Sequence, residues 1–94
     1  MALQVIRFGD DDAGFCRVSD QPDRLVLETI ELLPAFQQRG IGSELIRALQ
    51  RRALDRGVPV MLQVLKSNAR AKLLYERLGF FTVGEPATHH QMQS

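Results

Sequence analysis

The sequence predicts an α/β domain with layered α+β character. We expect a mixed, mostly antiparallel sheet, one strand–helix–strand crossover after the third strand, and two helices. Two observations carry this prediction. The first third of the 94-residue chain holds short apolar stretches separated by turn-forming residues, which is typical of antiparallel strands. The rest alternates amphipathic stretches of helical period with apolar stretches of strand length, which is typical of a strand–helix–strand unit.

Length and composition indicate a single domain over residues 1–94. The chain has 45% hydrophobic and 24% charged residues and a formal net charge of +1, a balance that gives no reason to expect nucleic acid as a partner. Cys16 is the only cysteine, which excludes an internal disulfide and favours a reducing compartment. No apolar run approaches the ~20 residues that span a bilayer, and residues 1–7 lack a long apolar region. We therefore expect a cytoplasmic protein with no membrane partner.

Three strands are expected first. Residues 3–8 and 15–19 are apolar-rich and flank the turn-forming segment 9–14, so they predict a hairpin. A second turn at 20–23 precedes a third strand at 25–33, which Pro34 ends. Because the connections are short, the simplest arrangement is an antiparallel meander.

A helix of about four turns should follow, ending at Gly57 in a left-handed cap. Its apolar side is formed by residues that recur at helical spacing, namely Ile41, Leu45, Ile46, Leu49 and Ala53. The nearly continuous apolar run 58–65 then predicts a strand buried on both faces. The order strand, helix, strand implies a right-handed crossover and a parallel pair.

The last third predicts one more helix and two short strands. A helix is expected over 69–78, where one stripe is formed by Ala71, Leu74, Tyr75 and Leu78. Gly79 should end this helix, and residues 80–83 predict a strand. The tail is expected to supply a final strand around 88–92.

The segment from residue 37 to residue 43 connects the third strand to the first helix and is a candidate anion cradle. Gly40 and Gly42 let the backbone turn sharply, and a helix start leaves about four N–H groups without intrahelical partners. These donors and the helix dipole favour a phosphate at that point. From the spacing alone, a purely packing role for the glycines is equally open. No Lys-Ser/Thr pair follows Gly42, which argues against a nucleotide-hydrolysing loop.

Two motifs occur in order and about 30 residues apart, covering the chain from about residue 15 to residue 81. The first is Gln37-x-x-Gly40-x-Gly42, and the second is Asn68-x-x-Ala71-x-x-Leu74-Tyr75-x-x-x-Gly79-Phe80. Together they resemble the GNAT superfamily of acetyl-CoA-dependent N-acetyltransferases. The resemblance implies transfer of an acetyl group from acetyl-CoA to a primary amine of a small molecule or a protein, by direct attack.

The resemblance also implies where coenzyme A binds. Its pyrophosphate would lie on the backbone amides of Gln38, Arg39, Gly40, Ile41, Gly42 and Ser43. The pantetheine arm would follow the exposed backbone of the preceding strand at Ile30, Glu31 and Leu32, where an N–H could also polarise the thioester carbonyl. Asn68 would reach the pantetheine or orient the site. From the residues alone, Asn68 could equally cap the second helix, and one residue could do both.

The implied general acid is Tyr75, which would protonate the departing thiolate. A phenol with a pKa of about 10 stays protonated at neutral pH, although a structural tyrosine on the buried stripe would look the same. For the general base, Glu28 is the first candidate and Glu31 the second. Strand alternation places them on opposite faces unless a bulge intervenes. Some family members carry a glutamate base where this chain has Gln63, which cannot accept the proton.

His89 and His90 are possible bases or ligands, but a polar pair near the end of a chain is more often at the surface. We expect no metal site.

One face of the sheet is expected to lack its usual cover. The family fold usually begins with a strand and two helices ahead of the hairpin, whereas this sequence begins at the hairpin. The sheet should then expose apolar surface, so we predict a homodimer. Two alternative functions stay open, namely a non-catalytic acyl-CoA-binding or regulatory module and a structural domain.

Overall fold

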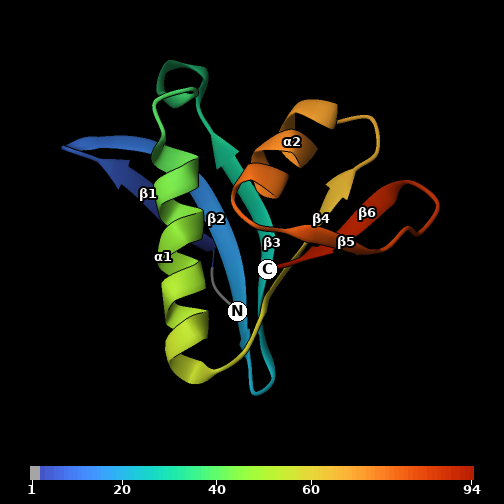
Figure 1. The fold of residues 1–94 in the computed structure, drawn as a ribbon. Coiled ribbons are helices and arrows are strands. Elements are labelled where there is room, and N and C mark those ends of the chain that lie inside the picture. The colour runs from blue at the N-terminus through green and yellow to red at the C-terminus, as the bar shows by residue number, and fades with distance from the viewer. Residues whose placement is uncertain (1–2) are drawn as a thin grey trace.

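The computed structural model describes residues 3–94, so Met1 and Ala2, at the start of the N-terminal segment considered above, lie outside it. The described chain begins with a meander of three strands and continues with alternating helices and strands (Figure 1). In order, the elements are β1 (Leu3–Phe8), β2 (Asp11–Gln21), β3 (Arg24–Leu32), the 3₁₀ turn η1 (Pro34–Phe36), α1 (Ile41–Arg56), β4 (Val60–Leu65), α2 (Ala69–Arg77), β5 (Phe81–Gly84) and β6 (His89–Gln93).

These elements form one mixed sheet with the strand order β1-β2-β3-β4-β6-β5. The pair β3–β4 is parallel and is connected through α1, whereas the other neighbours are antiparallel. The predicted fold class, with its crossover and two helices, is therefore confirmed. The sequence predicted the last strand but not its position, because β6 returns to lie between β4 and β5.

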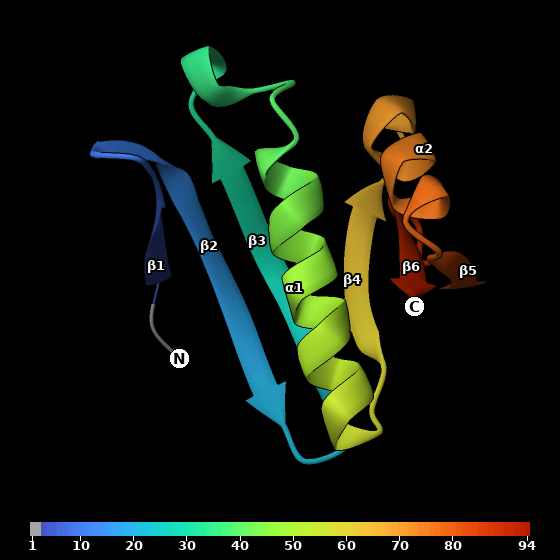
Figure 2. The same ribbon diagram turned by 60° about the vertical axis from the view of Figure 1, so that its left-hand side comes forward.

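The two parallel strands part soon after they meet. Pairing joins only Leu25–Leu27 of β3 to Val60–Leu62 of β4. Beyond this point β3 stays with β2, and β4 stays with β6, so the two strands diverge toward their carboxyl ends (Figure 2). Two backbone edges inside the sheet therefore face each other without pairing.

Both helices lie on the same face of the sheet, in front of it in Figure 1. The core lies between them and the strands, and its largest fully buried side chains are Leu25, Ile46, Val60 and Met92. The apolar stripe predicted for α1 is confirmed, and Gly57 caps the helix with φ +70°. A smaller cluster lies beneath the first turn of α1 and includes Ile6 and Cys16.

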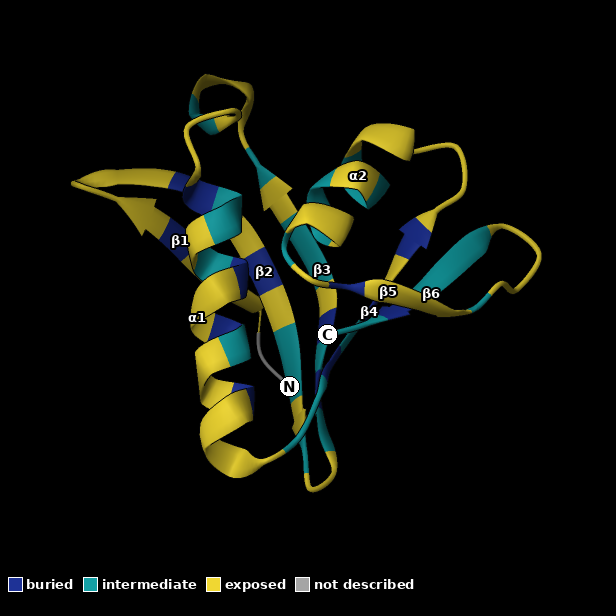
Figure 3. Cartoon of the chain, in the orientation of Figure 1, coloured by how far each residue is buried: buried dark blue, intermediate teal, exposed yellow. Residues whose placement is uncertain are grey.

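The expectation that β4 is buried on both faces was wrong. Val60, Leu62 and Val64 are buried, whereas Gln63 and Leu65 are exposed on the opposite side (Figure 3). The reason is that the described helices cover one face only. We call the other side the open face. The predicted uncovered apolar surface is present on it, since β1 and β2 expose Leu3, Val5 and Phe15 there.

The first turn is shorter than predicted. Residues 11–14 belong to β2, and the reversal is made by Gly9, with φ +63°, and Asp10. The sequence predicts Asp11 and Asp12 as turn residues, but they lie in β2. Acidic residues are tolerated in this strand because β1–β2 is an edge hairpin whose side chains are solvated. Arg7 and Asp12 are cross-strand partners, and Arg7 Nη1 lies 3.7 Å from Asp12 Oδ1.

Candidate active site

The segment 37–43, which we call the Gly loop, delivers a row of backbone amides to the start of α1. Gly40 has φ +79° and occupies the N-cap position, where it offers no side chain to cap the helix. The first helical hydrogen bond runs from the Glu44 N–H to the Gly40 carbonyl oxygen at 3.0 Å. The amides of residues 40–43 therefore precede the helical ladder, as an anion cradle requires.

The two glycines of the loop have different explanations. A glycine is favoured at position 40 because the backbone there is left-handed, a conformation that other residues adopt only at a cost in free energy. At Gly42, an added Cβ would meet only Leu32 Cδ1, at an ordinary contact distance of 3.8 Å. The packing of the chain therefore leaves room for a side chain at position 42, and the close approach of a ligand to Gly42 stays a prediction.

A groove of about 420 Å³ lies between the Gly loop and α2. From α2 it is lined by Asn68, Arg70, Ala71, Leu74 and Arg77. The two guanidinium groups give this groove a positive wall. With its amide oxygen turned toward α2, Gln38 accepts a hydrogen bond from Arg70 Nη1 at 3.3 Å. The backbone of Gln38 is in the left-handed region, with φ +62°. Its contact with Arg70 connects the Gly loop to α2 across the groove.

A second cavity, of about 300 Å³, fills the gap where β3 and β4 part, and we call it the splay cavity. Its lining brings together residues from four elements, including Glu28 and Glu31 of β3, Gln63 of β4, Tyr75 of α2 and His89 of β6. It adjoins the groove, because Asn68 and Ala71 line both.

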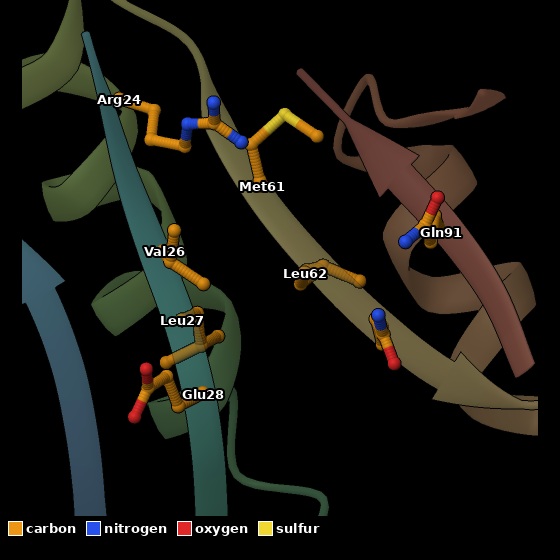
Figure 4. A pocket seen from close by; sticks show the side chains of 8 residues that line it. Arg24, Val26, Leu27, Glu28, Met61, Leu62 and Gln91 are labelled. Carbon is orange, nitrogen blue, oxygen red and sulfur yellow. The ribbon is translucent and has the colours of Figure 1, made fainter. Parts of the chain in front are cut away.

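The splay cavity also adjoins a third cavity, of about 350 Å³, which Glu28 and Gln63 help to line. Figure 4 shows this third cavity between the diverging strands, with Arg24 and Val26 on β3, Met61 on β4 and Gln91 on β6. Met61 alternates with the buried residues of β4, so the third cavity lies on the open face. Neighbouring cavities of the three thus share lining residues, and the series reaches from the Gly loop to the open face.

A bulge at Glu28 interrupts the alternation of β3 between the two candidate carboxylates. Arg17 pairs with Thr29 and Val18 pairs with Leu27, so Glu28 is an extra residue in β3. This is the condition under which strand alternation fails. Glu28 and Glu31 both line the splay cavity, and both residues are exposed.

Tyr75 lies on the half-buried stripe of α2, as predicted, and lines the splay cavity. Its ring packs edge-to-face on Phe80, with ring centroids 5.9 Å apart. Burial raises the pKa of the Tyr75 hydroxyl, because desolvation disfavours the phenolate. The hydroxyl is therefore held in its protonated form at neutral pH, in which it can donate a proton.

Asn68 caps α2 through Oδ1, which accepts a hydrogen bond from the Ala71 N–H at 3.1 Å. The same residue lines both the groove and the splay cavity. Its capping role is present in the structure, and a role in ligand binding stays a prediction.

The three expected pantetheine positions differ in backbone direction. The Leu32 carbonyl accepts from Gln37 Nε2 at 3.0 Å. The Glu31 carbonyl points toward β2, because a Cβ on Gly14 would lie 2.0 Å from its oxygen. Since backbone direction alternates along a strand, Ile30 is the position whose peptide groups face the gap.

The sequence named His89 and His90 as possible bases but favoured a surface position for both. Both terminal histidines are half-buried, and His89 lines the splay cavity because it pairs with Leu65 at the end of β4. Its Nδ1 lies 2.8 Å from Thr88 Oγ1. His90 faces elsewhere, with Nδ1 3.2 Å from Glu85 Oε1. The position of His89 beside the splay cavity follows from the pairing of β6 with β4, which no local pattern in the sequence predicts.

Within residues 3–94, neither helix combines the length and the apolar composition needed to span a bilayer. In the same residues, no group of three or more His, Cys, Asp or Glu side chains is placed to hold a metal ion.

Comparison with known proteins agrees with this geometry. The model of the Acetyltransferase (GNAT) family matches residues 3–80. The chain belongs to this family. Within it, streptothricin acetyltransferase of Streptomyces lavendulae is 37% identical over 84 residues, covering 86% of this chain and 44% of that protein. The ribosomal protein bS18-alanine N-acetyltransferase of Salmonella typhimurium is 44% identical over 72 residues, covering 76% of this chain and 49% of that protein.

The chain thus spans about half the length of these GNAT relatives. Among solved structures, the PaiA N-acetyltransferase of Thermoplasma acidophilum, in complex with coenzyme A, superimposes with a TM-score of 0.83. The alignment covers 94% of this chain and 56% of that one at 18% identity, so it shows the shared fold.

Proposed function

We propose that this GNAT chain is an N-acetyltransferase that transfers an acetyl group from acetyl-CoA to a primary amine by direct attack. The observation that carries the proposal is the set of three adjoining cavities that reaches from the Gly loop to the open face. A donor and an acceptor bound from opposite faces would meet beside Tyr75. The names of both curated relatives, which are acetyltransferases, and the coenzyme A complex of PaiA support the same function.

The groove suits the diphosphate end of coenzyme A. The free amides of residues 40–43 and the dipole of α1 would stabilise its negative charge, and Arg70 and Arg77 would add charge-assisted hydrogen bonds. Gly42 lets the phosphate approach the backbone closely. The pantetheine arm would then enter the gap and meet the peptide groups of Ile30.

The splay cavity would hold the reacting atoms. The amine nitrogen attacks the thioester carbonyl carbon, the new C–N bond forms, and the C–S bond breaks. Tyr75 donates its proton to the departing sulfur, which removes the cost of releasing a free thiolate. A base within the cavity takes the proton that the amine loses.

The acceptor is proposed as a primary amine of a small molecule or of a protein. The names of the relatives differ in the acceptor that they give, which is streptothricin in one case and an alanine of ribosomal protein bS18 in the other. The acceptor would bind in the open-face cavity beside Glu28, whose carboxylate attracts an ammonium group.

We also propose that the protein is a cytoplasmic homodimer. The unpaired, buried Cys16 fits a reducing compartment. On the open face, exposed apolar side chains of β1, β2 and β4 would be covered by a second copy. Sedimentation should show a monomer–dimer equilibrium at micromolar concentration, and a monomer without concentration dependence would contradict the dimer.

The alternative function is a non-catalytic acyl-CoA-binding module, and the exposure of both candidate carboxylates favours it. Such a module would use the Gly loop but show no turnover. A structural domain with a packing-only Gly loop would not bind coenzyme A at all.

The test of the donor site is a calorimetric titration with acetyl-CoA and with coenzyme A. Gly42→Ala should weaken binding at least about tenfold, or ~1.4 kcal/mol, since the added methyl projects at the ligand rather than into the chain. Leu54→Ala is the control, because it places an alanine at an exposed position of the same helix, outside the groove. If Gly42→Ala binds as the native protein does, the Gly loop is not the pyrophosphate site.

A further inference from the structure

The splay cavity contains an imidazole that the function described so far does not use. His89 begins β6 and pairs with Leu65, the last residue of β4. At this end of the sheet β3 and β4 have parted, so the side chain lines the cavity together with Tyr75, Glu28 and Glu31. Gln63, two residues earlier on β4, lies on the same cavity and cannot accept a proton.

The backbone holds His89 at a fixed point of this cavity. Its N–H donates to the Pro86 carbonyl at 3.1 Å, and the preceding carbonyl, of Thr88, accepts from the Lys66 N–H at 2.9 Å. The ring is oriented as well, since Nδ1 lies 2.8 Å from Thr88 Oγ1. If Nδ1–H donates to this hydroxyl, the lone pair of Nε2 is left to accept a proton.

We propose that His89, rather than a carboxylate, is the general base of the reaction. This inference rests on the proposed function. A base is most effective when its pKa lies near the working pH, and imidazole is the side chain best matched to neutral pH. Glu28 and Glu31, both exposed, provide negative charge that attracts the protonated amine and stabilises the imidazolium as it forms.

An amine that arrives as an ammonium ion first releases one proton to water on the open face, which frees the lone pair for attack. The remaining proton transfers take place within the splay cavity. Nε2 of His89 takes the proton from the amine nitrogen as the C–N bond forms, and Tyr75 gives its proton to the sulfur as the C–S bond breaks. His89 afterwards loses its proton to water on the open face, and water returns a proton to Tyr75. The other titratable groups that line the splay cavity with His89 are those of Glu28, Glu31 and Tyr75, while Glu85 lies against His90.

The experiment compares His89→Gln with His90→Gln, its neighbour on β6, as the matched control. Turnover is followed by thiol release from acetyl-CoA, with a peptide bearing a free N-terminal alanine and a primary-amine antibiotic as acceptors. His89→Gln should lower kcat about 10²- to 10³-fold at pH 7 and should keep the affinity for coenzyme A. It should also remove the fall in activity that the native protein shows on acidification, as the base is protonated.

A second variant, His89→Ala, should recover part of its activity when imidazole is added, which a purely structural residue would not do. The inference is overturned if His89→Gln keeps native kcat, or if Glu28→Gln alone removes the acidic limb of the pH profile. If the native protein binds coenzyme A but acetylates neither acceptor, the proposed function fails and the inference fails with it. These results are distinguishable, because only the last one concerns the native protein.

Discussion

Replacing Tyr75 by Phe tests the proposed acid, because the structure separates the packing of the ring from the chemistry of its hydroxyl. The ring lies edge-to-face on Phe80 at 5.9 Å, a contact that phenylalanine retains. The free energy of unfolding should therefore change by less than about 1 kcal/mol. Loss of general acid catalysis should lower kcat about 10²- to 10⁴-fold, which corresponds to ~3 to 5 kcal/mol in the activation free energy.

The assay combines thiol-release kinetics with calorimetry. Coenzyme A affinity should be unchanged in Tyr75→Phe, since the groove and the Gly loop are untouched. In the native protein, burial raises the pKa of Tyr75, so the donating form persists up to and beyond a pH of about 10, and turnover falls above that range. The same shift makes unfolding easier once the pH rises above about 10, because the unfolded chain ionises first. Native kcat in Tyr75→Phe would refute the acid role, and a parallel loss of coenzyme A binding would indicate a structural role.

Two further predictions concern residues whose roles the structure separates. Asn68→Ala should lose the cap of α2 and about 1 kcal/mol of stability, lowering Tm by ~4 to 8 °C, whereas Asn68→Asp keeps the capping oxygen; equal melting temperatures for the two variants would exclude the cap. Gly14→Ala should cost about 3 kcal/mol or more, because its Cβ would lie 2.0 Å from the Glu31 oxygen and push β2 from β3. A native denaturation midpoint for Gly14→Ala would contradict this close approach.

The order and type of the elements could be predicted because local patterns report them. The stripe on α1 and the left-handed Gly57 follow from a period of 3.6 residues and one glycine. The Gly loop and Tyr75 were likewise found from motifs, and the structure places both beside connected cavities. The local sequence was therefore sufficient to predict features that a single short segment forms.

The remaining features depend on contacts between distant segments. The bulge at Glu28 arises from the register of β2 against β3, and alternation along β3 alone does not show it. His89 joins the site because β6 inserts between β4 and β5, which is a property of the whole sheet. β4 looked doubly buried because its apolar residues outnumber its polar ones, although helices cover only one of its faces.

The divergence of β3 and β4 makes the sheet behave as two leaves, β1-β2-β3 and β4-β6-β5, hinged along Leu25–Leu27. A pantetheine arm bound in this gap, as we propose, would bridge the two leaves as a further strand would. Its binding would then reduce the motion of one leaf against the other. Amide hydrogens of Ile30 and of the end of β4 should exchange quickly in the empty protein and slow down together when the gap is filled.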